Sequence, residues 1–358
     1  VRGTRIQSTS PSAARLRGVA QVCPEAVAGV ACEVTDRPLD PTLLSPEIAE
    51  LEEKLRTSVI GQDEAARELV DVVMEFTGGL SDPTRPVASL LFTGPSGSGK
   101  TLTAEVVSRA LTAADDLIRI DCGTFQAAHE VAKLLGAPPG YLGHKETQPL
   151  ITQGKLTAAA GKGQIAFVLF DEIEKAHQAF HDVLLGVMDK AALTLGDGQR
   201  VSFSRAVLLM TANVGSREIA SAADGFGFGM PSTSTGTATR ACRAAFKPEF
   251  LNRLTRTIVF RPLTVEHLRS ILRIELDKVR SRLSTGPVPT ILCVDDAACA
   301  ALVTDGYEPR YGARHLARAV DTHVTRPLAR MLSSRQIAKG DAVLVRHDGQ
   351  YRFSVERH

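Results

Sequence analysis

The chain has 358 residues, a formal net charge of +2 and 44% hydrophobic residues, so it is long enough for about two domains with buried cores. Its 42 basic and 40 acidic residues are interspersed, which leaves neither a basic stripe for nucleic acid nor an acidic tail. No segment approaches the roughly 18 consecutive apolar residues of a membrane-spanning helix. These totals predict a folded globular protein that binds neither nucleic acid nor membranes.

The cysteines show neither a C-x-x-C pair nor the Cys/His spacing of a zinc site, so we expect scattered buried thiols in a reducing compartment. The six are Cys23, Cys32, Cys122, Cys242, Cys293 and Cys299. A cytoplasmic protein is the first expectation. Residues 1–24 contain four arginines, several Ser/Thr and no acidic residue, a composition that also fits a transit peptide for the mitochondrial or plastid matrix. A disordered tail is the other interpretation of this segment.

Residues 1–44 are rich in Pro, Ser and Arg without sustained periodicity, which predicts a disordered extension. Ordered structure is expected to begin with the segment "SPEIAELEEKLR", in which Ser45 is the expected N-cap and Pro46 occupies the first helical position. Apolar residues at helical spacing follow, so we expect an amphipathic helix here.

Apolar strands then alternate with helical segments, which predicts an α/β fold with a parallel sheet buried on both faces. The expected elements are strands at 89–94, 117–121, 165–171, 205–212 and 256–260, and a helix from Lys100 to about residue 111. After Pro262 the pattern becomes mostly helical. A long helix is expected at 264–283, and a strand pair at 342–355 turns at Asp348-Gly349. We therefore divide the chain into an extension (1–44), a large α/β domain (45–261) and a smaller helical domain (262–358).

The segment "GPSGSGKT" follows a predicted buried strand and opens a helix, which is the context that a phosphate-binding loop requires. Its backbone N–H groups and the helix N-terminus can surround the phosphates of ATP. Lys100 would reach the β- and γ-phosphates, and the Thr101 hydroxyl would bind Mg²⁺. The predicted loop consists of Gly94, Pro95, Ser96, Gly97, Ser98, Gly99, Lys100 and Thr101.

Two acidic residues end the apolar strand in "VLFDEIEKAH". Asp171 is placed to bind Mg²⁺, and the adjacent Glu172 to polarise a water molecule for attack on the γ-phosphate. The next strand ends in "LLMTANVGS", where Asn213 could help to hold that water. Together with the phosphate loop, these residues predict an ATP hydrolase.

The order of six motifs resembles the second ATPase module of the Clp/ClpB heat-shock unfoldases, within the AAA+ superfamily. The motifs are GPSGSGKT, GAPPGYLG, VLFDEIEKAH, MTANVGS, FKPEFLNRL and GYEPRYGAR. The resemblance runs from about residue 45 to the C-terminus.

Roles for further residues are implied by this resemblance. Val59 and Ile60, in "VIGQDEA", would edge the adenine pocket, and Asn213 would be the first sensor of the γ-phosphate. Arg253 would be the arginine finger that reaches the nucleotide of a neighbouring subunit, and Arg314 the second sensor. The resemblance thus implies a homo-hexameric ring in which assembly and ATP hydrolysis are coupled.

The loop "GAPPGYLGHKE" would line the central channel of such a ring, where Tyr141 and Leu142 grip an unfolded or misfolded polypeptide. His144 and Lys145 follow where the family usually carries acidic and glycine residues, so the channel rim is more basic here. The segment "LTLGDGQRVSF" (193–203) is expected to be a second channel loop or an ordinary surface hairpin.

Alternative functions are weighed against an ATP-dependent unfoldase. "DGFGFGM" places Phe226 and Phe228 where protease-coupled relatives carry a docking loop, so an ATPase subunit bound to a barrel peptidase is one alternative. A nucleic-acid-remodelling ATPase is another, although no basic, aromatic-interleaved loop supports it. A ring that binds ATP without turnover is the third, and the presence of Glu172, Asn213 and Arg253 argues against it.

Overall fold

The structure is a computed structural model, and it describes residues 42–112, 117–136, 149–161, 165–214, 234–307 and 312–356. The chain divides into two units, Val1–Ser45 and Pro46–His358, and the fold described below is that of the second. Within the described ranges, no helix combines the length and the apolar character needed to cross a membrane.

A five-stranded parallel sheet forms the centre of the fold, as predicted. Its order is β2-β3-β6-β1-β7, so β1 lies between β6 and β7. Every residue of β1 and β6 is buried, because their apolar side chains are covered on both faces. The strands are β1 (Ala88–Thr93), β2 (Ile118–Asp121), β3 (Ala166–Asp171), β6 (Ala206–Ala212) and β7 (Arg256–Val259).

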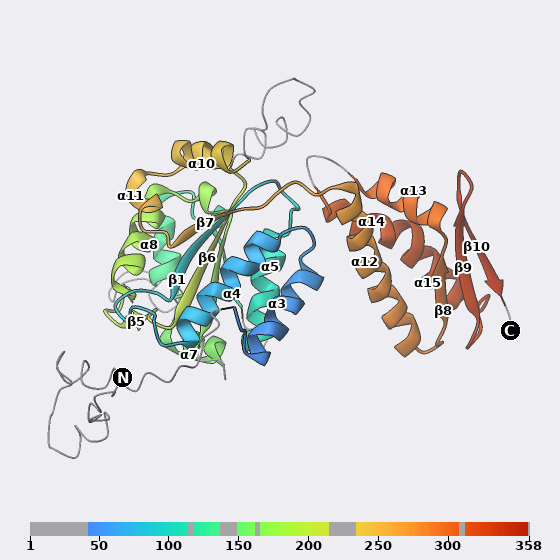
Figure 1. Ribbon diagram of the computed structural model, residues 1–358, viewed down its shortest axis with the longest axis horizontal. Coiled ribbons are helices and arrows are strands. Elements are labelled where there is room, and N and C mark those ends of the chain that lie inside the picture. The colour runs from blue at the N-terminus through green and yellow to red at the C-terminus, as the bar shows by residue number, and fades with distance from the viewer. Residues whose placement is uncertain are drawn as a thin grey trace, which may run out of the picture. The chain divides into compact units, whose positions relative to one another are not determined.

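Helices flank this sheet, and Figure 1 shows α3, α4 and α5 together on one side of it and α8 on the other. The helices are α3 (Pro46–Ser58), α4 (Asp63–Thr77), α5 (Lys100–Thr112), α6 (Val131–Leu135), α7 (Gln153–Ala160), α8 (Gln178–Lys190), α10 (Ser234–Ala245) and α11 (Pro248–Leu251). Short 3₁₀ turns lie at Cys122–Thr124, Ala128–Glu130 and Ile173–Lys175. The first helix begins at Pro46, as its sequence predicts.

The core on the α8 side shows how alternate strand residues build the fold. Val168 and Phe170 of β3 and Met210 of β6 pack there with Phe180 and Leu184 of α8. Burying a side chain of this size contributes about 1.5–3 kcal/mol, so the cluster holds the sheet and its helices in a fixed arrangement. This packing supports the sheet whose carboxyl edge carries the functional side chains.

The predicted hairpin at 193–203 is present. β4 (Ala192–Thr194) and β5 (Arg200–Ser202) pair antiparallel, and Leu193 opposes Val201. Both of these side chains are buried against the main core. The hairpin is therefore anchored at its base, while its role as a channel loop stays a prediction.

The C-terminal part is mostly helical and has its own apolar core. Its elements are α12 (Val265–Thr285), β8 (Ile291–Val294), α13 (Asp296–Gly306), α14 (Arg314–Val320), a π-helical turn (Asp321–Thr325), α15 (Arg326–Ser333), β9 (Ala342–His347) and β10 (Tyr351–Glu356). Thr264 caps α12 by accepting a hydrogen bond from the amide of His267. The helix buries Leu268, Leu272 and Leu276, whereas Val265 of the predicted apolar face is 55% exposed.

The strand pair expected at 342–355 belongs to a three-stranded sheet. β9 and β10 form the predicted antiparallel hairpin, but β8 also pairs with β9, in parallel. The third strand was missed because "ILCV" is short and its pairing partner lies about 50 residues further along the chain. Our boundary near residue 262 stays a prediction.

The expectation of buried thiols is only partly correct. Cys122 and Cys242 are buried, and burial raises the pKa of both thiols, so they act as small apolar side chains. Cys299 is half-buried and Cys293 is exposed. Cys293 lies on β8, and its neighbours Leu292 and Val294 face the core side of that strand, so the alternation of the strand turns the thiol outward.

Candidate nucleotide-binding site

The sheet brings the predicted site residues to one edge. β1, β3 and β6 are parallel neighbours, so their carboxyl ends meet at the same place. The phosphate loop follows β1, Asp171 ends β3 and Asn213 follows β6. Open α/β sheets bind ligands at this end of their strands, which makes this edge the candidate site.

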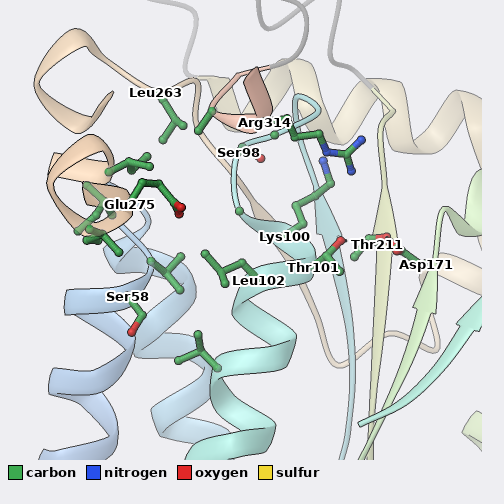
Figure 2. A pocket seen from close by; sticks show the side chains of 18 of the residues that line it. Ser58, Ser98, Lys100, Thr101, Leu102, Asp171, Thr211, Leu263, Glu275 and Arg314 are labelled. Atoms are coloured by element: carbon green, nitrogen blue, oxygen red, sulfur yellow. Dashed lines mark hydrogen bonds between the residues drawn. The ribbon is translucent and has the colours of Figure 1, made fainter. Parts of the chain in front are cut away.

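A cavity of about 420 Å³ opens there, a volume within the usual range for small-molecule sites. Figure 2 shows Lys100, Thr101, Asp171 and Arg314 at one end of this cavity, and Ser58, Leu102, Leu263 and Glu275 toward the other. Of the predicted residues, Val59, Ile60, Gly97, Ser98, Gly99, Lys100, Thr101, Asp171, Glu172, Asn213 and Arg314 line it. Gly94, Pro95 and Ser96 do not, and Pro95 and Ser96 line a smaller adjacent cavity of about 40 Å³.

Lys100 is the first residue of α5 and is only 6% exposed. Its ammonium group donates hydrogen bonds to the carbonyls of Gly94 and Pro95, both at 2.8 Å, and to Asn213 Oδ1 at 3.0 Å. Burial, the largest effect, lowers the pKa of Lys100 to about 8. A positive charge held this way, next to the amides of a glycine-rich loop, is suited to bind an anion.

Nucleotide affinity is expected to fall as the pH rises above about 8. Protonated Lys100 attracts the phosphates, and deprotonation through its lowered pKa removes that charge. Because one proton is involved, the decline is at most about tenfold per pH unit, and the phosphates themselves are already ionised in this range. Titration of a fluorescent ATP analogue between pH 7 and 9.5 measures the effect, and a constant affinity over that range would contradict it.

Asp171 is surrounded by three side chains from different elements. Its Oδ1 accepts hydrogen bonds from Thr101 at 3.3 Å and from Thr211 of β6 at 2.5 Å. Its Oδ2 pairs with the guanidinium of Arg119 on β2 at 2.5 Å, and Arg119 also lies 3.7 Å from Glu105. The carboxylate is therefore oriented by its neighbours and shares the cavity wall with the Thr101 hydroxyl. Hydroxyl and carboxylate oxygens are ligands that suit Mg²⁺.

Glu172 takes a left-handed backbone conformation, with φ of 57°, directly after β3. That conformation costs a non-glycine residue about 1–2 kcal/mol. The Thr211 hydroxyl accepts a hydrogen bond from the Glu172 amide at 2.9 Å and so helps to stabilise this conformation. The Glu172 carboxylate accepts a hydrogen bond from Asn213 Nδ2 at 3.3 Å and pairs with Lys175. The turn thus directs a carboxylate into the cavity beside Lys100 and Asn213.

A hydrogen bond from its backbone amide helps to hold Asn213 in place. Its amide N–H donates to Glu174 Oε1 at 3.0 Å, while its side chain joins Lys100 to Glu172. An amide group can accept from the lysine and donate to the carboxylate at once. Asn213 therefore fixes the separation of these two charged groups.

The other end of the cavity is apolar. Val59 and Ile60 come from the turn between α3 and α4, Leu263 precedes α12, and Ile271 and Ile274 belong to α12. Glu275 and Lys278, which form an ion pair at 2.7 Å, also line this end. An apolar slot with a polar edge suits a planar base, whereas the opposite end suits phosphates.

Arg314 reaches the cavity from the C-terminal part. It begins α14, and the preceding Gly312 and Ala313 approach the phosphate loop, with the Ala313 amide 3.4 Å from the Gly97 carbonyl. Gly312 has φ of 55°, and a Cβ there would lie 2.9 Å from the carbonyl oxygens of Ser96 and Gly97. Only glycine permits this approach, which places Arg314 beside Lys100 (Figure 2).

Arg253 is not part of the cavity. It lies after α11 and pairs through Nε with Asp189 Oδ1 of α8 at 2.6 Å. Tyr141, Leu142, His144, Lys145 and the segment 224–230 lie outside the described residues.

Sequence reasoning missed three side chains that contact the predicted site. Thr211 orders both Asp171 and Glu172, Arg119 pairs with Asp171, and Gln62 contacts the phosphate loop at Ser98. For Thr211 there was a signal, because it is the one polar residue in the apolar strand β6, which ends at the site. Arg119 alternates with apolar residues in β2, which also contains Asp121, so its signal was weaker. Gln62 had no such signal, since it stands in a turn.

Two protein-family models match this chain, one over its large α/β part and one over its helical C-terminal part. The family model described as "AAA domain (Cdc48 subfamily)" matches residues 85–257. The model described as "C-terminal, D2-small domain, of ClpB protein" matches residues 263–345. The two matches follow each other in the order expected for a large domain and a small domain.

Individual relatives agree with these matches. The chain is 39% identical over 303 residues to chaperone protein ClpB 1 of Parasynechococcus marenigrum, covering 84% of this chain and 34% of that protein. It is 37% identical over 319 residues to the Clp protease ATP-binding subunit ClpC of Staphylococcus aureus, covering 87% and 38%. A closed-state cryoEM reconstruction of Hsp104 with ATPγS and FITC casein matches with a TM-score of 0.75 at 28% identity, covering 96% of this chain and 55% of that one.

The parallel sheet and the loop between β1 and α5 define a phosphate-loop nucleotide-binding protein. Together with the family matches and relatives, they show that the chain belongs to the AAA+ ATPases and corresponds to the second module of the Clp/ClpB group. The chain spans about a third of the length of the curated relatives it matches.

Proposed function

We propose that the chain is the ATP-hydrolysing module of a Clp-type protein unfoldase. The observation that carries this proposal is a single cavity in which Lys100, Thr101, Asp171, Glu172 and Asn213 converge. The cavity thus combines a cation, a hydroxyl, two carboxylates and an amide, the groups that ATP hydrolysis would use. Relatives named as the chaperone ClpB and as the Clp protease subunit ClpC support the unfoldase class.

The residues divide the reaction between them. Lys100 and the loop amides would bind the β- and γ-phosphates and neutralise charge as the bond to the leaving phosphate breaks. Glu172 would accept a proton from the attacking water, and Asn213 would hold Glu172 at the right distance from Lys100. Arg314 adds a second positive charge at the same end of the cavity.

A magnesium ion fits this site. Thr101 and Asp171 supply hard oxygen ligands 3.3 Å apart, and Mg²⁺ usually combines one or two protein ligands with phosphate oxygens and waters. In the described ranges no cluster of three or more His, Cys, Asp or Glu is arranged to hold a metal alone, which agrees with a site completed by the nucleotide. The bound ion would neutralise the negative charge of the phosphates.

Arg253 is assigned to catalysis in a neighbouring subunit. It does not line the cavity of its own subunit, and its side chain, which pairs with Asp189, is 45% exposed. An arginine finger supplied by a neighbour raises phosphoryl-transfer rates by roughly 10³–10⁵-fold. We therefore propose that the chain works as a homo-hexameric ring in which each cavity is completed by the next subunit.

Polypeptide is the proposed substrate, gripped by Tyr141 and Leu142. Both lie outside the described residues, so this role rests on the motif and on the family. Residues on either side are placed: α6 ends at Leu135, and α7 begins at Gln153 within the domain that contains the ATP site.

The variant Tyr141→Ala is expected to lose unfolding of a tagged substrate while it keeps basal ATP turnover. An aromatic side chain grips extended polypeptide through apolar contact, and alanine removes that contact. Substrate unfolding and ATPase rate are measured in parallel. The control is Leu80→Ala, because Leu80 is 81% exposed and lies after α4. Equal unfolding by Tyr141→Ala and the wild type would overturn the channel role.

An ATPase subunit of a Clp protease is the second candidate. The similarity to ClpC favours it, since that relative is named as an ATP-binding subunit of the Clp protease. Phe226 and Phe228 would then dock a barrel peptidase. Co-purification with such a peptidase separates the two candidates.

A further inference from the structure

Gln62 is a buried side chain that the proposed reaction does not use. It stands between α3 and α4, directly after Gly61, and is 4% exposed. Its Nε2 donates to the Ser98 carbonyl at 3.2 Å and to the Arg261 carbonyl at 3.0 Å. Its Oε1 accepts the Arg261 amide N–H, also at 3.0 Å. One carboxamide therefore binds the phosphate loop on one side and both backbone groups of Arg261 on the other.

Arg261 belongs to the short linker between β7 and α12, where β7 ends at Val259 and Thr264 caps the helix. Leu263 in this linker lines the nucleotide cavity, and so does Ile271 of α12. The segment that Gln62 holds thus leads directly to the residues that would contact the base.

Close packing on both sides of Gln62 leaves this segment little freedom. A Cβ at Gly61 would lie 2.5 Å from the ring of His267 in the first turn of α12. A Cβ at Gly94, where the phosphate loop begins, would lie 2.4 Å from the Phe260 carbonyl. The turn before α4 therefore packs against a side chain of α12, and the start of the phosphate loop packs against the backbone at Phe260. The Gln62 side chain hydrogen-bonds to both the loop and the linker.

We propose that Gln62 is a positioning residue that transmits occupancy of the phosphate loop to the linker at 261–264 and to the start of α12. This proposal rests on the nucleotide-binding function proposed above. When the loop closes on phosphates, a shift of the Ser98 carbonyl moves the amide, and the paired hydrogen bonds carry that shift to Arg261. A glutamine is required because only a carboxamide offers two donors and an acceptor at this reach without charge.

Gln62→Glu tests the proposal with almost no change in shape. The carboxylate still accepts from the Arg261 amide, but it cannot donate to the carbonyls of Ser98 and Arg261. In Gln62→Glu the buried carboxylate also faces the two carbonyl oxygens, so its nucleotide affinity should fall further than that of an uncharged variant, for which the loss of a net hydrogen bond of about 1 kcal/mol predicts a decrease of about fivefold. Gln62→Met fills a similar volume without charge and removes all three hydrogen bonds, so it decides the result if Gln62→Glu does not fold. The control is Gln350→Glu, in the exposed turn between β9 and β10.

Amide hydrogen exchange at residues 261–268 is the measurement, with and without saturating ATPγS. In the wild type and in Gln350→Glu, we expect nucleotide to slow exchange in this segment. In Gln62→Glu and Gln62→Met, nucleotide should bind and protect the loop at 94–101 while this segment loses its added protection. A variant that merely destabilised the fold would instead exchange faster throughout, with or without nucleotide.

Four results would overturn the proposal, and the last of them would also overturn the proposed function. Wild-type protection of residues 261–268 in the Gln62 variants would show that the amide does not transmit occupancy. General destabilisation of both variants, without a selective loss at the linker, would make Gln62 structural. If the wild type bound ATPγS without any protection of the linker, the coupling would be refuted and the proposed function would stand. If the wild type did not bind ATPγS, both the coupling and the proposed function would be refuted.

Discussion

Glu172→Gln is expected to lower ATP turnover by about 10²–10⁴-fold, the usual contribution of a general base. The amide keeps the shape of the side chain and can still accept from Asn213 Nδ2, but it cannot take a proton from water. Nucleotide binding should persist, since Lys100 and the loop amides are unchanged. Steady-state phosphate release, measured beside the affinity for a fluorescent ATP analogue, separates the two effects.

The matched control for this variant is Glu53→Gln. Glu53 is an exposed residue of α3 that does not line the cavity, and its substitution makes the same chemical change from carboxylate to amide. Its turnover should equal that of the wild type. Turnover of Glu172→Gln within tenfold of the wild type would contradict the assignment of Glu172 as the base and return attention to Glu174, whose carboxylate contacts the Asn213 amide.

Lys100→Met is expected to weaken nucleotide binding by a hundredfold or more. A charge-assisted hydrogen bond contributes about 1.5–3 kcal/mol, and Lys100 is placed to make such bonds with two phosphates. Methionine preserves the apolar stem in its buried position and removes the ammonium group. Equilibrium binding of ATPγS measures the loss, and circular dichroism checks that the fold persists.

Lys339→Met provides the control, because Lys339 is exposed in the segment before β9 and away from the cavity. Its affinity for ATPγS should match the wild type. If Lys100→Met bound nucleotide within threefold of the wild type, the cavity would not be the phosphate site, and the proposed function would lose its principal support.

Much of the fold followed from local patterns. The buried strands β1, β3 and β6 each consist of six or seven mostly apolar residues, a signal that needs no knowledge of the neighbours. The phosphate loop is contiguous, so its residue types and spacing were readable directly. β8 was missed because its pairing with β9 depends on a distant segment.

The residues of the candidate site could be predicted from the sequence, but the contacts between their side chains could not. Asp171, Glu172 and Asn213 were expected together, because parallel strands bring their carboxyl ends to one edge. Thr211 and Arg119 were not assigned, since their roles come from side chains on adjacent strands that sit 40 and 52 positions away from Asp171. The Arg253–Asp189 pair likewise joins distant segments, the turn after α11 and helix α8, and was not anticipated.

By itself, the sequence determined the presence of a phosphate loop, a buried parallel sheet and a helical C-terminal part, since each is encoded by contiguous residue types or by local periodicity. Only the tertiary structure decided the order β2-β3-β6-β1-β7, the partners of Lys100 and the placement of Arg314 beside it. The same holds for Gln62, whose bond to the Arg261 carbonyl spans 199 positions. Such contacts form when distant segments pack against each other, and local sequence carries no record of which segments meet.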